Sequence, residues 1–234
     1  MSKRVEFSVV IPAAGVGARM RADRPKQYLP LHGKTVLEHT LDCFLGHPSL
    51  QHLVVSLAVD DPFWPRLPIA ADSRVLRAPG GLERADSVLN GLERLRALEL
   101  PDEHWVLVHD AARPLLHADD LTLLLDTLAD DAVGGLLAVP ARDTLKQAEQ
   151  GRVARTLERS RIWQAFTPQM FRLGTLYDAL SRALAAGTTV TDEASAIEWL
   201  GLAPRLVEGR SDNLKITRPE DLALAAFYLS HKGA

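Results

Sequence analysis

The sequence predicts an α/β fold in which a mostly parallel sheet is covered by helices on both faces. Apolar runs of five to seven residues, typical of buried strands, alternate with longer segments whose apolar residues recur at helical spacing. The 234 residues are 47% hydrophobic and 24% charged, the balance of a globular protein that can bury its own core. We therefore expect one domain spanning residues 1–234.

The strands are predicted from apolar runs that show no alternation with polar residues. The first run ends at Pro12 and indicates a strand that is buried on both faces, as strands of parallel sheets are. The same pattern recurs along the chain, so the predicted strands are 7–11, 52–58, 105–109 and 135–139. In such sheets ligands bind beyond the carboxyl ends of the strands.

Helices are predicted between and after these strands, at 36–45, 83–98, 121–128, 173–186, 191–200 and 218–229. Asp119 and Asp120 are placed to cap the third of them, and Thr217 with Glu220 forms a capping-box pattern before the last. Strands alternating with helices favour a Rossmann-like topology.

The segment 140–160 departs from this alternation. It is rich in Arg, Lys, Gln and Glu, is too polar for a core strand, and has Gly151 at a position suited to a hairpin turn. One interpretation is a solvated loop. The other is a protruding β-hairpin arm that contacts a partner subunit.

The charge distribution indicates what kind of molecule the protein binds. Residues 1–34 hold seven Lys or Arg against two acids, which gives +5 and leaves −8 for the remaining chain. Nucleic-acid binders usually carry a basic face across the domain, so a small anionic ligand near the N-terminus fits better. We expect no signal peptide, and the sequence has no apolar run of eighteen residues. Its only cysteine, Cys43, is expected to be a buried structural thiol in a helix rather than a nucleophile or redox centre. We expect a cytoplasmic protein that binds neither nucleic acid nor membrane.

A glycine loop directly after the first strand is the strongest local signal. Gly15 and Gly17 allow close approach of the backbone to phosphate oxygens, and Arg19 and Lys26 follow on what we expect to be a solvated loop. Met20 replaces the third glycine of a dinucleotide fingerprint, and the loop lacks the Gly-Lys-Ser/Thr of a Walker motif. A triphosphate fits the charge of this loop, although a strand-turn-helix glycine among solvated charges remains an alternative.

Other candidate residues follow later strands. Asp110 ends a strand and could hold a divalent ion beside a triphosphate, or serve only as a turn residue, and His109 is interpreted as a packed histidine. Gly81 and Ser87 belong to a glycine turn before a helix. Thr191 and Lys215 are helix-cap neighbours that contact a ligand only by hypothesis.

These residues belong to a set of motifs that resembles one enzyme family over nearly the whole chain. The motifs are Pro12-Ala-Ala-Gly-x-Gly-x-Arg19-Met, Pro25-Lys-Gln-Tyr-Leu29, Glu83-Arg-Ala-Asp-Ser-Val88, Val108-His-Asp-Ala-Ala-Arg-Pro114, Thr167-Pro-Gln169, Thr191-Asp-Glu-Ala-Ser195 and Asp212-Asn-x-Lys-x-Thr-x-Pro219. In this order they resemble the 2-C-methyl-D-erythritol 4-phosphate cytidylyltransferases of non-mevalonate isoprenoid synthesis.

The resemblance implies a magnesium-dependent transfer of CMP from CTP to methylerythritol phosphate, with release of pyrophosphate, in a homodimer. By similarity the catalytic residues are Arg19, Lys26, Arg159 and Lys215, and Asp110 holds the metal. The implied CTP-binding residues are Ala13, Ala14, Gly15, Gly17, Gly81 and Ser87. The implied substrate-binding residues are Arg113, Thr144, Thr167 and Thr191, with Thr144 and Arg159 supplied by the arm of the other subunit. Leu82 stands where relatives often have a polar residue, so backbone amides are expected to contact the cytosine there.

Two alternatives remain. A ribitol-5-phosphate cytidylyltransferase shares the glycine loop and the Pro-Lys-Gln motif, but the motifs around Asp110 and Thr191 favour methylerythritol phosphate. A non-catalytic nucleotide-binding regulator would be expected to lose Arg19, Lys26 or Asp110, and all three are present.

Overall fold

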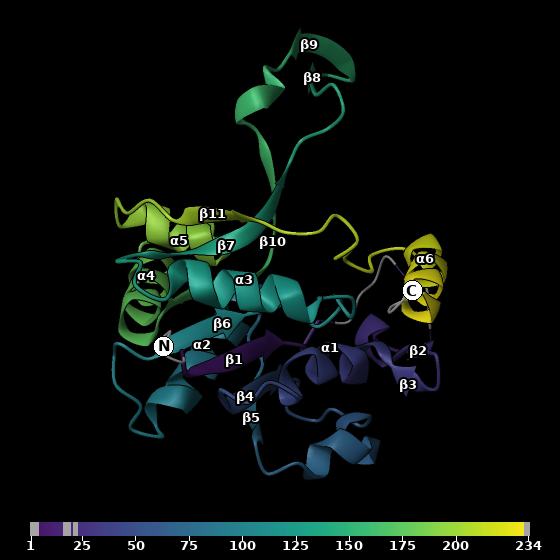
Figure 1. The fold of residues 1–234 in the computed structure, drawn as a ribbon, viewed down its shortest axis with the longest axis vertical. Coiled ribbons are helices and arrows are strands. Elements are labelled where there is room, and N and C mark those ends of the chain that lie inside the picture. Colours follow the sequence, from purple (N-terminus) through teal and green to yellow (C-terminus); the bar gives the residue numbers. More distant parts are fainter. Residues whose placement is uncertain (1–4, 16–19, 21–22, 232–234) are drawn as a thin grey trace.

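A mixed seven-stranded sheet forms the centre of the computed structural model, which describes residues 5–15, 20 and 23–231 (Figure 1). Its strands, in spatial order, are β11 (Arg205–Glu208), β7 (Gly134–Pro140), β10 (Trp163–Arg172), β6 (Trp105–Val108), β1 (Phe7–Pro12), β4 (Leu50–Leu57) and β5 (Val75–Pro79). Strand β10 is antiparallel to both of its neighbours, whereas the other pairs in this sheet are parallel. The expected Rossmann-like, mostly parallel α/β architecture is confirmed.

Helices cover both faces of this sheet. Residues of α1 (Val36–Leu45) and α3 (Ala118–Leu128) pack on one face, and residues of α2 (Arg84–Arg96), α4 (Leu173–Ala185) and α5 (Glu193–Trp199) pack on the other. Helix α6 (Pro219–Ser230) belongs to a third apolar cluster, together with residues of the short hairpin of β2 (Pro30–Leu31) and β3 (Lys34–Thr35).

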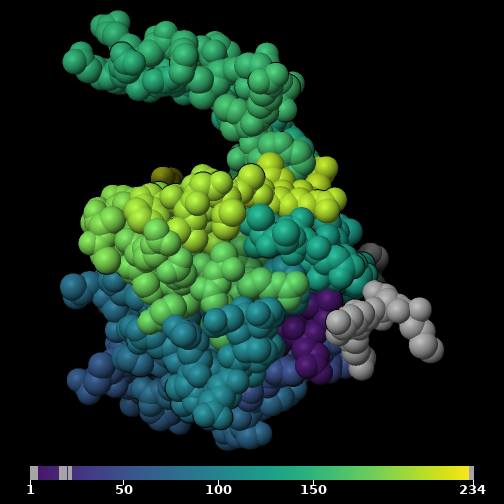
Figure 2. Space-filling model, turned by 90° about the vertical axis from the view of Figure 1, so that its left-hand side faces the viewer, coloured from purple at the N-terminus to yellow at the C-terminus, as the bar shows by residue number. Residues whose placement is uncertain are grey.

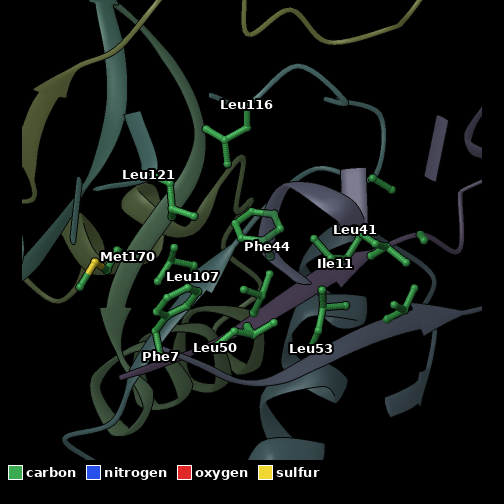
Figure 3. Packing of buried hydrophobic residues seen from close by; sticks show 14 of the residues in the cluster. Phe7, Ile11, Leu41, Phe44, Leu50, Leu53, Leu107, Leu116, Leu121 and Met170 are labelled. Carbon is green, nitrogen blue, oxygen red and sulfur yellow. The ribbon is translucent and has the colours of Figure 1, made fainter. Parts of the chain in front are cut away.

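The alternation of side chains along β1 explains how one strand supports two cores. Val9 and Ile11 belong to the cluster beneath α1 and α3, whereas Val10 belongs to the cluster beneath α2 and α4. Successive side chains of a strand point to opposite faces, so an unbroken apolar run is required here. Figure 3 shows the first cluster, in which Phe44 and Leu41 of α1 meet Ile11 and Leu107 of the sheet.

The polar segment forms a hairpin, as the arm interpretation expects. Strands β8 (Lys146–Glu149) and β9 (Arg152–Thr156) pair with each other and not with the central sheet, and Gly151 has a φ of 75° at the turn. Side chains along β9 are exposed throughout. Figures 1 and 2 show the hairpin standing clear of the rest of the chain.

Several local expectations need correction. Helix α3 begins at Ala118 with His117 as its N-cap. Asp119 and Asp120 therefore do not cap the helix but lie in its first turn, where acidic side chains interact favourably with the helix dipole. At α6 the capping acid is Asp221 rather than Glu220, because its Oδ2 accepts from the Thr217 and Arg218 amides. Cys43 is only partly buried.

Strands β5, β10 and β11 were not expected. Strands β5 and β11 are the two edge strands of the sheet, and few of their side chains are buried. Neither strand therefore has the continuous apolar run from which the other strands are predicted. Strand β10 contains Pro168, and its pairing with β7 is interrupted between Ala165 and Gln169. No helix within the described part of the chain is long and apolar enough to cross a membrane.

Candidate active site

Two cavities adjoin at the carboxyl edge of the parallel strands. The first has a volume of about 370 Å³ and the second about 230 Å³. Arg84, Asp110 and Lys215 line both cavities, so these three side chains form the junction between them.

The first cavity gathers the residues expected to bind a nucleotide. Its walls come from the ends of β1 and β6, the turn after β5 and the loop before α6, and they include Ala13, Ala14, Gly15, Lys26, Gly81, Ser87, Asp110 and Lys215. Arg19 and Gly17 lie outside the described residues. Leu82 also lines this cavity and its side chain is fully exposed.

Buried polar side chains shape the walls of this cavity. Gln27 donates from Nε2 to the carbonyl oxygens of Ala13, at 2.7 Å, and Gly15, at 3.1 Å, and thereby holds the start of the glycine loop. Ser87 Oγ accepts from the Gly81 amide at 3.0 Å and fixes the turn before α2. Gln27 is a component of the site that sequence reasoning missed, although it stands in the quoted Pro-Lys-Gln motif.

Lys26 does not lie on a freely solvated loop, as the sequence suggested. It begins a short 3-10 helix, Lys26–Tyr28, and its Nζ donates to the Ile216 carbonyl at 2.9 Å. Ile216 follows Lys215, so this hydrogen bond joins the 3-10 helix to the segment that carries the second lysine of the cavity.

The second cavity gathers the residues expected to bind the other substrate. Its lining includes Arg113, Thr167 and Thr191 as well as the three junction residues. The Thr167 hydroxyl accepts from the Asp110 amide at 3.0 Å, and Arg113 donates to the carbonyl of Asn213 at 2.6 Å. Thr144 and Arg159 are exposed on the arm and are not among the described residues that line this cavity in one chain.

Asp110 lies among three cations at the junction. Its Oδ1 accepts from Arg84 Nε at 3.1 Å, and its Oδ2 is 3.3 Å from Arg113 Nε and 2.9 Å from Lys215 Nζ. Burial alone would raise the pKa of this carboxyl, but the positive charges of Arg84, Lys215 and Arg113 hold the pKa well below its usual range. Asp110 is therefore ionised throughout the physiological pH range.

The neighbouring His109 is a packed residue, as expected. It is fully buried, its Nε2 lies 3.0 Å from the Arg113 carbonyl, and its Nδ1 lies 3.0 Å from Thr167 Oγ1. Burial lowers the pKa of His109 to about 4. The neutral imidazole thus supports the loop that carries Asp110 and Arg113.

The junction suits a divalent ion only in the presence of further ligands. Among the described residues no group of three His, Cys, Asp or Glu side chains could hold a metal by itself. Asp110 Oδ1 receives a single side-chain donor from the described residues, which leaves acceptor capacity on that oxygen. One carboxylate oxygen fits Mg²⁺, which commonly takes its remaining ligands from phosphate oxygens and water.

Arg84 and Glu193 were also missed by sequence reasoning. Both stand inside motifs quoted for the family resemblance, but neither received a role there. Arg84 bridges Asp110 and Glu193, and Glu193 is completely buried. No local pattern could have predicted this contact, because the two residues are separated by 109 positions.

Comparison with known proteins identifies the family of the chain. The family model of 2-C-methyl-D-erythritol 4-phosphate cytidylyltransferase matches residues 7–231. Proteins of that name from Ectopseudomonas mendocina (strain ymp) and Pseudomonas putida (strain GB-1) are 68% and 69% identical over 219 and 217 residues. These alignments cover 93% and 92% of both chains, respectively.

Solved structures agree as well. A crystal structure of 4-diphosphocytidyl-2C-methyl-D-erythritol synthase superimposes with a TM-score of 0.84 at 39% identity, covering 97% of this chain and all of the other. The Francisella tularensis 2-C-methyl-D-erythritol 4-phosphate cytidylyltransferase gives a TM-score of 0.82 at 38% identity, covering 95% of this chain and 99% of the other. The chain therefore belongs to the 2-C-methyl-D-erythritol 4-phosphate cytidylyltransferase family.

Proposed function

We propose that the chain transfers CMP from CTP to 2-C-methyl-D-erythritol 4-phosphate, with CTP in the first cavity and the polyol phosphate in the second. The observation that carries this assignment is the shared lining of the two cavities by Arg84, Asp110 and Lys215. A phosphate oxygen of the second substrate then attacks the α-phosphorus of CTP. The bond between the α-phosphorus and the bridging oxygen breaks, and pyrophosphate leaves.

The side chains present suit a reaction driven by charge and geometry. A phosphate monoester is largely dianionic near neutral pH, so it needs no general base to become nucleophilic. The two anionic substrates repel each other, and cations beside the substrates reduce that repulsion and align the reacting groups. We assign this role to Lys26 and Lys215, together with Arg19 of the glycine loop.

We propose that the first cavity selects a pyrimidine base through the protein backbone of the turn at Gly81. Gly81 and Ser87 hold a turn against the cavity, and the fully exposed Leu82 offers no polar group to a base. We therefore assign contact with the cytosine to the backbone of this turn, which lines the first cavity.

Mg²⁺ is proposed to be held by Asp110, where it would supply positive charge to the triphosphate. The carboxylate is ionised and one of its oxygens retains acceptor capacity, which supports the assignment. We expect Asp110→Asn to shift the magnesium dependence of turnover to higher concentrations. An unchanged magnesium titration would remove Asp110 from the metal site.

The active unit is proposed to be a homodimer in which the arm supplies Thr144 and Arg159 to the second cavity of the partner. Support comes from the exposure of both residues on a hairpin that pairs with no strand of the central sheet. Each site would then combine residues of two chains.

The assignment is tested by pyrophosphate release from CTP in the presence of methylerythritol phosphate or ribitol 5-phosphate. We expect turnover with methylerythritol phosphate and little with ribitol 5-phosphate. ATP should not replace CTP. A preference for ribitol 5-phosphate, or comparable rates with ATP, would contradict the assignment.

A further inference from the structure

A buried ion pair lies directly behind the junction of the two cavities. Arg84 Nη1 is 2.6 Å from Glu193 Oε1, and Arg84 Nη2 is 3.1 Å from Glu193 Oε2. The two parallel contacts form the bidentate geometry that gives an arginine-carboxylate pair a fixed orientation. Glu193 is completely buried and does not line either cavity, and among the described side chains its hydrogen bonds go to Arg84, which does.

Neither side chain is needed to start its own helix. Helix α5 is capped by Asp192 and Ser195, whose side chains each accept from the backbone amide of the other, and Glu193 takes no part in this exchange. Helix α2 has Glu83 as its N-cap, and the Glu83 amide donates to Asp86 Oδ2 at 2.9 Å. Arg84, in the first turn of α2, opposes the helix dipole, so its position needs a compensating interaction.

The compensation comes from two carboxylates on different elements. Arg84 uses Nη1 and Nη2 for Glu193 and Nε for Asp110, so one planar guanidinium spans both acids. Coulombic attraction from Glu193 and Asp110 outweighs the effect of burial and raises the pKa of Arg84. The ion pairs around Asp110 and Glu193 include three cations, Arg84, Arg113 and Lys215. The net formal charge of the five side chains is +1, and without Glu193 it would be +2.

We propose that Glu193 is a positioning residue for the transfer reaction, which holds the Arg84 guanidinium so that Arg84 orients Asp110 between the two substrates. This inference rests on the proposed transferase function. With Glu193 in place, Arg84 presents Nε to Asp110 and keeps its other two nitrogens away from the phosphates. Without Glu193, those two nitrogens are released to pair with Asp110 or with a substrate phosphate, and the geometry of the junction changes.

The expected kinetic signature is a loss of kcat with little change in CTP affinity. Misplacement of a reacting group by about 1 Å can cost up to about 10²-fold in rate, whereas extra charge at the junction does not weaken anion binding. Glu193→Gln should therefore lower kcat about tenfold or more, while the CTP dissociation constant changes less than about threefold.

Removal of a buried charge can also unfold a protein, so conservative variants are needed. Glu193→Asp keeps the charge but shortens the side chain by one methylene, and Arg84→Lys keeps the charge but loses the planar fork. These two variants and their combination form a double-mutant cycle. Glu198→Gln removes an exposed carboxylate from the same helix and is the matched control.

The inference predicts that Glu193→Asp and Arg84→Lys each lower kcat, and that the double variant is no slower than the slower single variant. Thermal midpoints of the conservative variants should not track these losses, and Glu198→Gln should match the wild type. Wild-type kcat in Glu193→Asp, or losses that multiply in the double variant, would overturn the positioning role. An inactive wild-type protein in the same assay would instead contradict the transferase function, and the role of Glu193 with it.

Discussion

At the scale of single residues, Lys26 combines a place in the first cavity with a hydrogen bond to a distant segment, and its sequence motif does not separate the two. Its ammonium lines the first cavity and also donates to the Ile216 carbonyl, beside Lys215. If CTP binds as proposed, loss of Lys26 removes positive charge from beside the triphosphate and also removes the hydrogen bond to the segment that carries Lys215.

We expect Lys26→Ala to lower the rate of the chemical step by roughly 10²-fold or more, as loss of a charge-stabilising donor commonly does. Single-turnover measurement with saturating CTP and methylerythritol phosphate isolates that step. Lys34→Ala, which removes an exposed lysine paired with Asp42, is the control and should remain within about twofold of wild type. A Lys26→Ala rate within a few-fold of wild type would exclude the proposed role.

The lowered pKa of His109 predicts how the free energy of unfolding depends on pH. Because burial lowers the pKa of His109 to about 4, the folded protein keeps this imidazole neutral where the unfolded chain binds a proton. The unfolded state thus gains protons first as the pH falls below about 6.5, and stability decreases from there towards pH 4.

The predicted loss of unfolding free energy from His109 between pH 6.5 and pH 5 is about 1.5 kcal/mol. Denaturant unfolding of wild type and His109→Gln at both pH values measures it, and the variant should show a smaller decrease. His231→Gln changes an exposed histidine and should keep the wild-type decrease. Equal decreases in wild type and His109→Gln would contradict this origin.

At the scale of elements, the sequence predicts the helices and strands whose buried side chains follow a regular spacing. Helix α1 is predicted at its exact bounds, because Thr35 and Glu38 form a capping box before a regular apolar stripe. Strands β5 and β11 were missed because edge strands need few buried side chains. Strand β10 was missed because Pro168 and a break in pairing interrupt it near Thr167.

The same distinction applies to the site. Gly15 and Gly81, which are expected to contact the nucleotide through the backbone, have recognisable local patterns and line the first cavity. Gln27, Arg84 and Glu193 act through contacts between distant segments, and neither hydrophobic period nor glycine spacing encodes such contacts. Their motifs were visible in the sequence, but their partners were not.

The turn before α2 gives a prediction at this scale. A Cβ at Gly81 would lie 2.1 Å from the Asp86 Cβ, which is too close for any real contact, so Gly81→Ala must displace the turn. We expect Gly81→Ala to raise the KM for CTP about tenfold, because the displaced backbone no longer fits the base. Steady-state kinetics measures this change.

Gly46 is the matched control, because a Cβ there meets no atom within 4 Å and its φ of −77° suits alanine. Gly46→Ala should leave the KM for CTP unchanged. If Gly81→Ala also left it unchanged, the turn would not form part of the nucleotide site.

At the scale of the whole molecule, the arm projects away from the central sheet and its helices (Figures 1 and 2). Strands β7 and β10 stay paired up to Pro140 and Trp163, and the Ala141 amide still donates to the Ile162 carbonyl at 2.9 Å. Beyond this point β8 and β9 pair only with each other within the described chain. Because the hairpin stands clear of the rest of the described chain, Arg159 can contact a substrate only if the arm lies against a partner subunit, as proposed.

The proposed reciprocal dimer predicts that two inactive variants restore each other. Lys26→Ala damages the glycine loop of one chain and Arg159→Ala damages the arm of the other. In a mixed dimer one site combines both defects and the other is intact. Random assembly makes about half of the dimers mixed, so roughly a quarter of all sites should recover after joint unfolding and refolding.

The measurement is pyrophosphate release from the refolded mixture, compared with each variant refolded alone. Mass spectrometry of the intact dimers verifies that subunits have exchanged. An arm that serves its own chain leaves one defect in every site and predicts no recovery, as does a monomer. Recovery to about a quarter of wild-type activity would assign Arg159 to the partner's site, whereas no recovery after verified exchange would reject the shared site and leave the family assignment intact.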